Sequence, residues 1–326
     1  MKRFPLSIFS FDTLRSVRSK TVLALAAALL MGAGVEGLCR TFLQEATTGW
    51  DYWTQTAASK YITYARLQAQ GTVPGVLTVG DSSADYGFSP VDFNEAVGRP
   101  GYAYNLATLG NFPLSFDETV NEMVLDASGP HPAYLFILFT RGGFERRDQM
   151  RPTERSVLTS PVVRQSNGSR TVGHFFALAR LWPSRMSLLD QARRGAAPIS
   201  SERGFQARDD ASGAVPERPA TQRPFVLDPE RLAVLEKTFA LCRRHGIQPI
   251  LVHPPIHSLE RYRWVNPDAY VEAAAQLGSQ YQVPFWDYSR DSRYDDYMRD
   301  LVHLNPEGAR AFSIELARRF QGWLRP

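Results

Sequence analysis

The chain has 326 residues, of which 44% are hydrophobic and 21% charged. This length suits one sizeable domain with additional segments, and the composition excludes a disordered chain. The net charge of +4 is modest, and the absence of a Lys/Arg-rich block argues against nucleic-acid binding. The only cysteines, Cys39 and Cys242, exclude a disulfide scaffold, and neither has a partner at metal-ligand spacing.

The N-terminus joins a basic segment to an apolar one. Residues 1–20 contain five Lys or Arg side chains, and residues 21–35 contain no charge. A helix of this length is close to the roughly 30 Å thickness of a bilayer core. We predict a cytoplasmic segment at 1–20 and a single membrane anchor at 21–38. The remainder would then lie in the periplasm of a bacterium, attached to the inner membrane. A cleaved signal peptide is the alternative.

Five short apolar runs further along the chain are typical of buried parallel strands. They span residues 75–80, 102–107, 133–139, 248–253 and 283–287. Helical patterns alternate with them at residues 116–125, 229–245, 268–281 and 306–324. This alternation predicts an α/β fold whose parallel sheet carries helices on both faces. We assign residues 39–70 to a connecting helical segment and residues 71–326 to the α/β domain.

The connection between the third and fourth strands is too long for a simple crossover. Residues 145–228 contain one helical pattern at 174–194 and a polar run at 195–223 that is almost without large apolar side chains. Such a composition is typical of an insertion that does not build a core. Two interpretations stay open, a lid or partner-docking segment and a tolerated surface insertion.

A Gly-Asp-Ser tripeptide, Gly80-Asp81-Ser82, ends the first predicted strand. In open α/β sheets, binding sites form at the carboxyl ends of strands, and a serine at the start of a helix lies where negative charge is stabilised. We therefore predict Ser82 as a nucleophile. The tripeptide alone is weak evidence, because Asp and Ser also form ordinary turns and helix caps.

A second motif precedes the last predicted helix, where Asp300 and His303 are three residues apart. A serine hydroxyl needs a base to accept its proton, and the base needs a group that orients it. His303 is the predicted base and Asp300 the predicted orienting carboxylate. The competing interpretation is a packed histidine beside a helix cap.

Taken together, the two motifs resemble the first and last sequence blocks of the SGNH (GDSL-type) hydrolase superfamily. The resemblance covers residues 70–326 apart from 145–228. It implies a flavodoxin-like three-layer fold and ester chemistry by Ser82, His303 and Asp300, with no metal and no cofactor. The family's oxyanion hole also uses a glycine after the second strand, matched by Gly110, and an asparagine after the third.

No asparagine follows the third strand, where the sequence reads Thr140-Arg141-Gly142-Gly143. The remaining candidate donors are Asn111 and Arg141. Loss of one oxyanion donor typically costs about 10²–10³ in rate, which argues against fast hydrolysis.

This departure and the predicted anchor shift the resemblance towards membrane-tethered SGNH-like proteins that accompany membrane-bound O-acyltransferases. Those proteins serve polysaccharide O-acetylation or teichoic acid D-alanylation. The resemblance implies acyl transfer, most simply of acetyl, to an exported polysaccharide through a serine ester. A multi-span O-acyltransferase and a glycan acceptor would be the partners. A periplasmic carbohydrate esterase and a non-catalytic scaffold that binds glycan or acyltransferase remain as alternatives.

Two further groups of residues bear on the site. His253 and His257 lie at the end of the fourth strand and just after it, at the sheet edge predicted for Ser82, and are candidates to line an acceptor groove. Aromatic side chains between residues 50 and 64, Tyr64 among them, fit either a membrane interface or a helix packed under the sheet.

Overall fold

A computed structural model describes residues 60, 63–64, 67–68, 70–108, 116–125, 129–145, 205 and 222–324. The chain divides into two units, Met1–Thr47 and Thr48–Pro326, and the described residues all belong to the second. The predicted anchor at 21–38 and most of the predicted insertion lie outside the described residues. Within the described ranges, no helix is both long and apolar enough to cross a bilayer.

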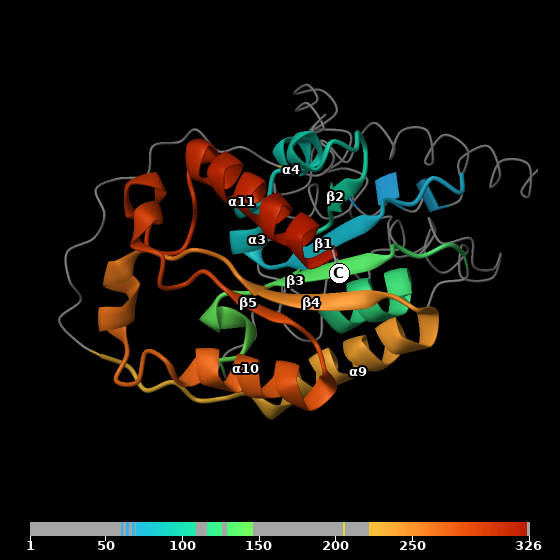
Figure 1. The fold of residues 1–326 in the computed structure, drawn as a ribbon. Helices are drawn as coiled ribbons and strands as arrows, with labels where there is room; N and C mark the ends of the chain where they lie inside the picture. Colours follow the sequence, from blue (N-terminus) through green and yellow to red (C-terminus); the bar gives the residue numbers. More distant parts are fainter. Residues whose placement is uncertain are drawn as a thin grey trace, which may run out of the picture. The chain divides into compact units, whose positions relative to one another are not determined.

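The second unit is built on one sheet of five parallel strands, as predicted (Figure 1). The strands are β1 (Val76–Gly80), β2 (Ala103–Asn105), β3 (Tyr134–Leu138), β4 (Gln248–His253) and β5 (Phe285–Asp287). Their order, β2-β1-β3-β4-β5, is the flavodoxin-like doubly wound order. β2 is shorter than predicted because only three of its residues pair with β1.

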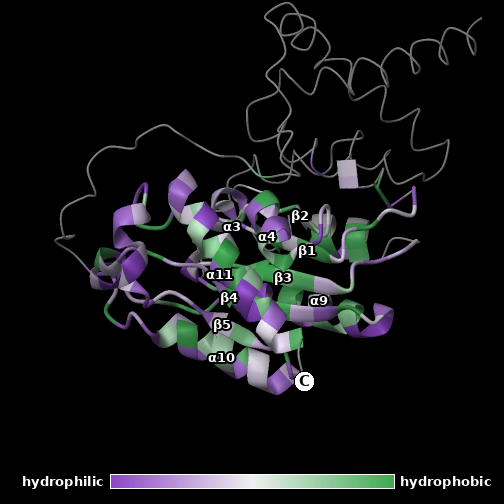
Figure 2. Ribbon diagram, turned by 45° about the horizontal axis from the view of Figure 1, so that its top comes forward, coloured by the Kyte–Doolittle hydropathy of each residue, from purple (hydrophilic) through white to green (hydrophobic). Residues whose placement is uncertain are grey.

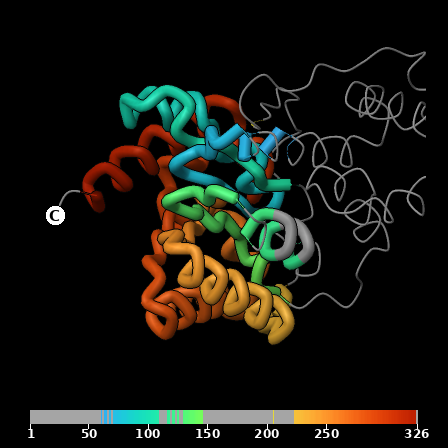
Figure 3. The backbone as a smooth tube through the Cα atoms, turned by 90° about the vertical axis from the view of Figure 1, so that its right-hand side faces the viewer, coloured from blue at the N-terminus to red at the C-terminus, as the bar shows by residue number. Residues whose placement is uncertain are grey.

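Helices cover both faces of this sheet (Figures 1 and 3). One face carries α3 (Ser82–Gly87), α4 (Pro90–Val97) and α11 (Pro306–Leu324), and the other carries α9 (Pro229–His245) and α10 (Ala269–Tyr281). Short 3₁₀ helices follow three strands: η3 (Arg141–Gly143), η4 (Ser258–Arg263) and η5 (Ser292–Tyr297).

Alternating side chains of each strand enter two separate apolar cores. In β1, Leu77 and Val79 pack with α9 and α10, whereas Val76 packs with α4 and α11. Figure 2 shows the hydrophobic residues concentrated along the central strands. Strands buried on both faces in this way are expected to read as continuous apolar runs, which is why the sequence revealed them.

Two features differ from the sequence predictions. The segment predicted as an ordinary helix at 116–125 winds as a π-helix, η2 (Asp117–Leu125), whose buried Asn121 accepts a hydrogen bond from Thr238 of α9 at 2.8 Å. In addition, the core begins before residue 71. Tyr64 is 2% exposed and lies against the Tyr104 ring of β2, which supports the packed interpretation for this tyrosine.

The backbone needs a glycine at position 80, where the end of β1 lies against Leu138 of β3. The φ of Gly80 is +155°, and a Cβ there would lie 1.9 Å from the Leu138 carbonyl oxygen. We expect Gly80→Ala to destabilise the fold by about 3 kcal/mol, because the adjacent backbone must move. Urea unfolding measures this loss. Gly322→Ala is the control: it lies in α11 with open space around it, and should be neutral or stabilising. Equal effects of the two substitutions would contradict the prediction.

Candidate active site

Ser82 is the first residue of α3 and lies just beyond the carboxyl end of β1. The preceding Asp81 caps this helix: its Oδ1 accepts hydrogen bonds from the Ser83 backbone N–H at 2.9 Å and from the Ser83 hydroxyl at 2.5 Å. The Asp81 carboxylate therefore fixes the turn that presents Ser82. Because Asp81 is the cap, the capping interpretation does not conflict with the prediction of Ser82 as a nucleophile.

The structure brings together the three residues predicted from the two motifs. His303 Nε2 lies 2.8 Å from Ser82 Oγ, and His303 Nδ1 lies 2.7 Å from Asp300 Oδ2. Because a carboxylate only accepts, Nδ1 carries the proton in this pair. Nε2 is then the acceptor that faces the serine hydroxyl, which is the arrangement that a serine nucleophile requires.

Asp300 is held from two sides. Its Oδ1 accepts the backbone N–H groups of Val302 and His303, both at 2.9 Å, while its Oδ2 faces the imidazole. Burial raises the pKa of Asp300, but the hydrogen bond and charge of His303 and these backbone bonds outweigh that effect and lower the pKa to about 2. The carboxylate thus stays ionised at any physiological pH.

The low pKa of Asp300 predicts a pH dependence of stability. Since the folded-state pKa lies below the unfolded value near 3.8, ionised Asp300 stabilises the fold above pH 4. This contribution is lost as the pH falls from about 4 to about 2. We expect the difference in unfolding free energy between the wild type and Asp300→Asn to shrink over that window in urea titrations. A difference that stays constant from pH 5 to pH 2 would contradict the assignment.

Two further side chains support this arrangement. The Tyr86 ring meets the His303 ring edge-on, with centroids 5.5 Å apart. The Arg299 guanidinium lies over the Tyr86 ring, and its Nη2 is 3.8 Å from Asp300 Oδ2. Neither was predicted. Arg299 directly precedes Asp300 in the chain, but nothing in the sequence indicated that the Tyr86 ring lies against His303.

Asn105, at the end of β2, ties α3 to the sheet. Its buried amide donates to the carbonyl oxygens of Ala84 at 2.9 Å and Phe88 at 2.8 Å, and its Oδ1 accepts from the Ala107 backbone N–H at 2.9 Å. Sequence reasoning missed this role. A single polar residue within the apolar run 102–107 was the available signal.

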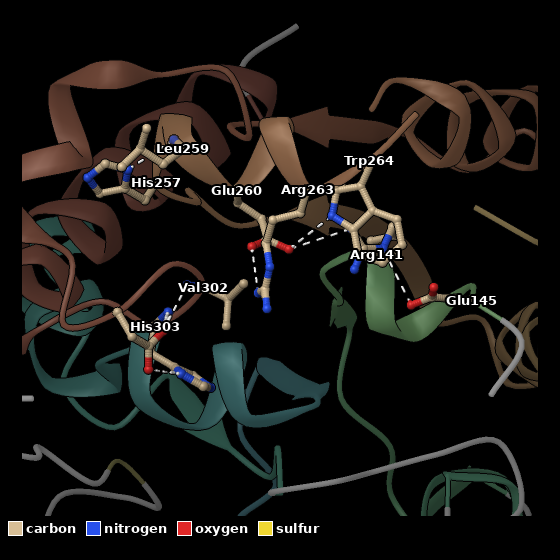
Figure 4. A network of polar contacts seen from close by, with 10 residues as sticks. Arg141, Glu145, His257, Leu259, Glu260, Arg263, Trp264, Val302 and His303 are labelled. Carbon is tan, nitrogen blue, oxygen red and sulfur yellow. Dashed lines mark hydrogen bonds and ion pairs between the residues drawn. The ribbon is translucent and has the colours of Figure 1, made fainter. Parts of the chain in front are cut away.

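Arg141 follows β3, but the structure gives it partners other than the predicted oxyanion (Figure 4). Its guanidinium stacks on the Trp264 ring and lies 3.4 Å from Glu145 and 3.5 Å from Glu260. Figure 4 shows this group set apart from His303. The predicted oxyanion role of Arg141 therefore finds no support among its contacts, since the two carboxylates and the indole hold it. Gly110 and Asn111 lie outside the described residues and stay predictions.

His253 does not line a groove. It is 2% exposed, its Nδ1 donates to the Pro254 carbonyl oxygen, and its Nε2 accepts from the Tyr270 hydroxyl, both at 2.7 Å. Burial lowers the pKa of His253 to about 4, so the imidazole is neutral. The groove role predicted for His253 was wrong because α10, which carries Tyr270, covers this side chain. His257 instead caps η4 by accepting the Leu259 N–H at 3.0 Å.

The described part of the chain is thus a doubly wound α/β domain with a serine, a histidine and an aspartate in hydrogen-bond contact at the carboxyl edge of its sheet. Within these described ranges, no cluster of three or more His, Cys, Asp or Glu side chains is placed to hold a metal ion.

No protein-family model and no curated protein sequence matches the chain. Among solved structures, a lipase/acylhydrolase from Enterococcus faecalis is similar, with 14% identity and a TM-score of 0.39 over 78% of this chain and 98% of that one. A structural-genomics protein from Lactobacillus plantarum shows 12% identity and a TM-score of 0.38 over 77% and 96%. Likeness at this level assigns no activity to this chain.

Proposed function

We propose that this protein is an SGNH-type enzyme that forms an acyl ester on Ser82 and transfers the acyl group, most simply acetyl, to an exported polysaccharide. The hydrogen-bonded chain from Ser82 through His303 to Asp300 carries the proposal. Two motifs more than 200 residues apart in sequence meet with the distances and the tautomer that nucleophilic catalysis needs.

The proposed reaction has two half-steps. In the first, His303 Nε2 takes the Ser82 proton while Oγ attacks the acyl carbonyl carbon, and the imidazolium then returns the proton to the departing group. In the second, a sugar hydroxyl loses its proton to Nε2 and attacks the serine ester. This attack gives a tetrahedral intermediate. When the intermediate collapses, the acylated sugar is released and the His303 imidazolium returns the proton to Ser82 Oγ. Asp300 stabilises the imidazolium in both half-steps.

Two observations favour transfer over hydrolysis. The predicted anchor at 21–38 would hold the domain beside a membrane-bound O-acyltransferase that supplies the acyl group. The asparagine that follows the third strand in the hydrolases is also absent from this sequence, and Arg141, which follows β3, is held by acidic partners. A weaker oxyanion hole slows attack by water, and a bound polysaccharide can compensate by proximity.

The competing esterase function uses the same three residues, and partitioning of the acyl-enzyme separates the two. We expect the full-length chain, acetylated by an aryl acetate, to lose the acetyl group at least tenfold faster when oligosaccharide acceptors are added, with acetylated sugar as the product. Mass spectrometry measures both species. Loss at one rate with and without every acceptor, and free acetate as the only product, would favour the esterase. Stoichiometric glycan binding without any acetyl adduct would favour a scaffold.

A further inference from the structure

A buried ion pair lies beneath the helix that begins at Ser82. Asp85, three residues further along α3, is fully buried, and Lys60, from the segment before β1, is 3% exposed. The Lys60 ammonium contacts the Asp85 carboxylate. Removing two charges from water costs so much that an apolar pair of the same size often stabilises a fold equally well. Stability alone therefore does not account for this pair.

Lys60 is fixed independently of Asp85. The Tyr104 hydroxyl of β2 donates to the Lys60 backbone carbonyl at 3.0 Å, and Tyr64, four residues later, packs against the same tyrosine. These contacts hold the backbone from which the Lys60 side chain extends. Burial lowers the pKa of Lys60, while the Asp85 carboxylate opposes that shift and favours the charged form.

The ammonium joins two elements that meet at the candidate site. Besides Asp85 of the serine helix, it donates to the Ala107 carbonyl oxygen at 2.7 Å. The next residue, Thr108, donates its backbone N–H to the Gly80 carbonyl oxygen at 3.2 Å. The segment after β2 therefore runs beside the turn that presents Ser82, and in the sequence it leads to Gly110, the predicted oxyanion donor.

We infer that Lys60 is a positioning residue that sets the spacing between the Ser82 helix and the segment that follows β2. The inference rests on the proposed function. In that function Ser82 attacks the acyl carbonyl carbon while the oxyanion donor predicted after β2 binds the carbonyl oxygen, so the spacing between the two segments affects the rate. Displacement of about 1 Å at such a site can slow a reaction about 10²-fold. Lys60 also makes the stretch that precedes the α/β domain part of its active-site scaffold.

The test compares three forms of the full-length chain: wild type, Lys60→Met, and Lys60→Met with Asp85→Leu. The single change leaves a buried carboxylate unpaired and should lower the Tm by about 10 °C. The double change removes both charges and should restore the Tm to within about 3 °C. We nevertheless expect the double variant to acylate Ser82 about 30- to 100-fold more slowly with an aryl acetate, and the peptide covering 103–108 to exchange its amide hydrogens faster.

The matched control is Lys237→Met with Asp117→Leu, which removes a partly exposed Lys–Asp pair of α9 and η2 and should leave acylation unchanged. A double variant at Lys60 and Asp85 with the restored Tm, wild-type acylation and wild-type exchange would overturn the inference. If that variant does not fold, the single variant Lys60→Met is assayed well below its Tm. Slower acylation than in the wild type is again expected there, and a wild-type rate would overturn the inference. A wild-type chain without a Ser82 adduct refutes the proposed function, and the exchange comparison still decides whether Lys60 orders residues 103–108.

Discussion

Replacing Ser82 with alanine is expected to lower turnover of an aryl acetate by at least about 10³-fold, because no other group replaces the attacking Oγ. The fold should survive the change. The Asp81 cap bonds to Ser83 rather than to Ser82, and within the described part of the chain the Ser82 hydroxyl bonds to His303 alone. Initial rates measured with the full-length chain, beside its Tm, test this prediction.

Ser83 is the matched control for Ser82. It is adjacent and 3% exposed, and its hydroxyl donates to Asp81 at 2.5 Å. Ser83→Ala should cost about 1 kcal/mol of stability, because the hydroxyl bond to Asp81 is lost while the backbone cap bond remains, and should keep turnover within about tenfold of the wild type. If Ser83→Ala were inactive and Ser82→Ala active, the nucleophile would be misassigned.

Replacing Asp300 with asparagine is expected to lower kcat by about 10⁴-fold with little change in KM. The amide can turn its NH₂ group towards His303 Nδ1, and the imidazole proton then moves to Nε2, where it blocks acceptance of the serine proton. The backbone bonds to Val302 and His303 need only one acceptor oxygen, so the loop can keep its shape.

Asp296→Asn serves as the control for Asp300, since it is an exposed aspartate four residues earlier and should behave as wild type. Steady-state kinetics on both variants give the comparison. If Asp300→Asn retained more than about a tenth of the wild-type kcat, orientation of His303 by this carboxylate would be contradicted.

The parts of the fold that local pattern governs were predictable from the sequence. Strands buried on both faces appear as apolar runs. Helix α9 begins at Pro229 after an Asp228 cap and ends at His245, before the Gly246 cap, whose φ is +67°. The approach of Ser82 to His303 was also predictable, because both motifs occupy recognisable places beside the first strand and the last helix.

Contacts between distant segments without a shared pattern were not predictable. Arg141 follows its strand as expected, but its position depends on Trp264, more than 100 residues later in the chain. His253 ends β4 as expected, but Tyr270 of α10 buries it. Lys60 and Asp85 pair across 25 residues without a spacing rule that would connect them. In each case tertiary packing, rather than local sequence, selects the partner.

The most direct test of the central claim is intact-mass spectrometry of the full-length chain after exposure to an aryl acetate. The site geometry predicts one acetyl adduct that peptide mapping assigns to Ser82, that is absent in Ser82→Ala and that forms much more slowly in Asp300→Asn. A wild-type chain that stays folded and gains no adduct, or gains one at another residue, would contradict the assignment of Ser82 as an acyl-carrying nucleophile.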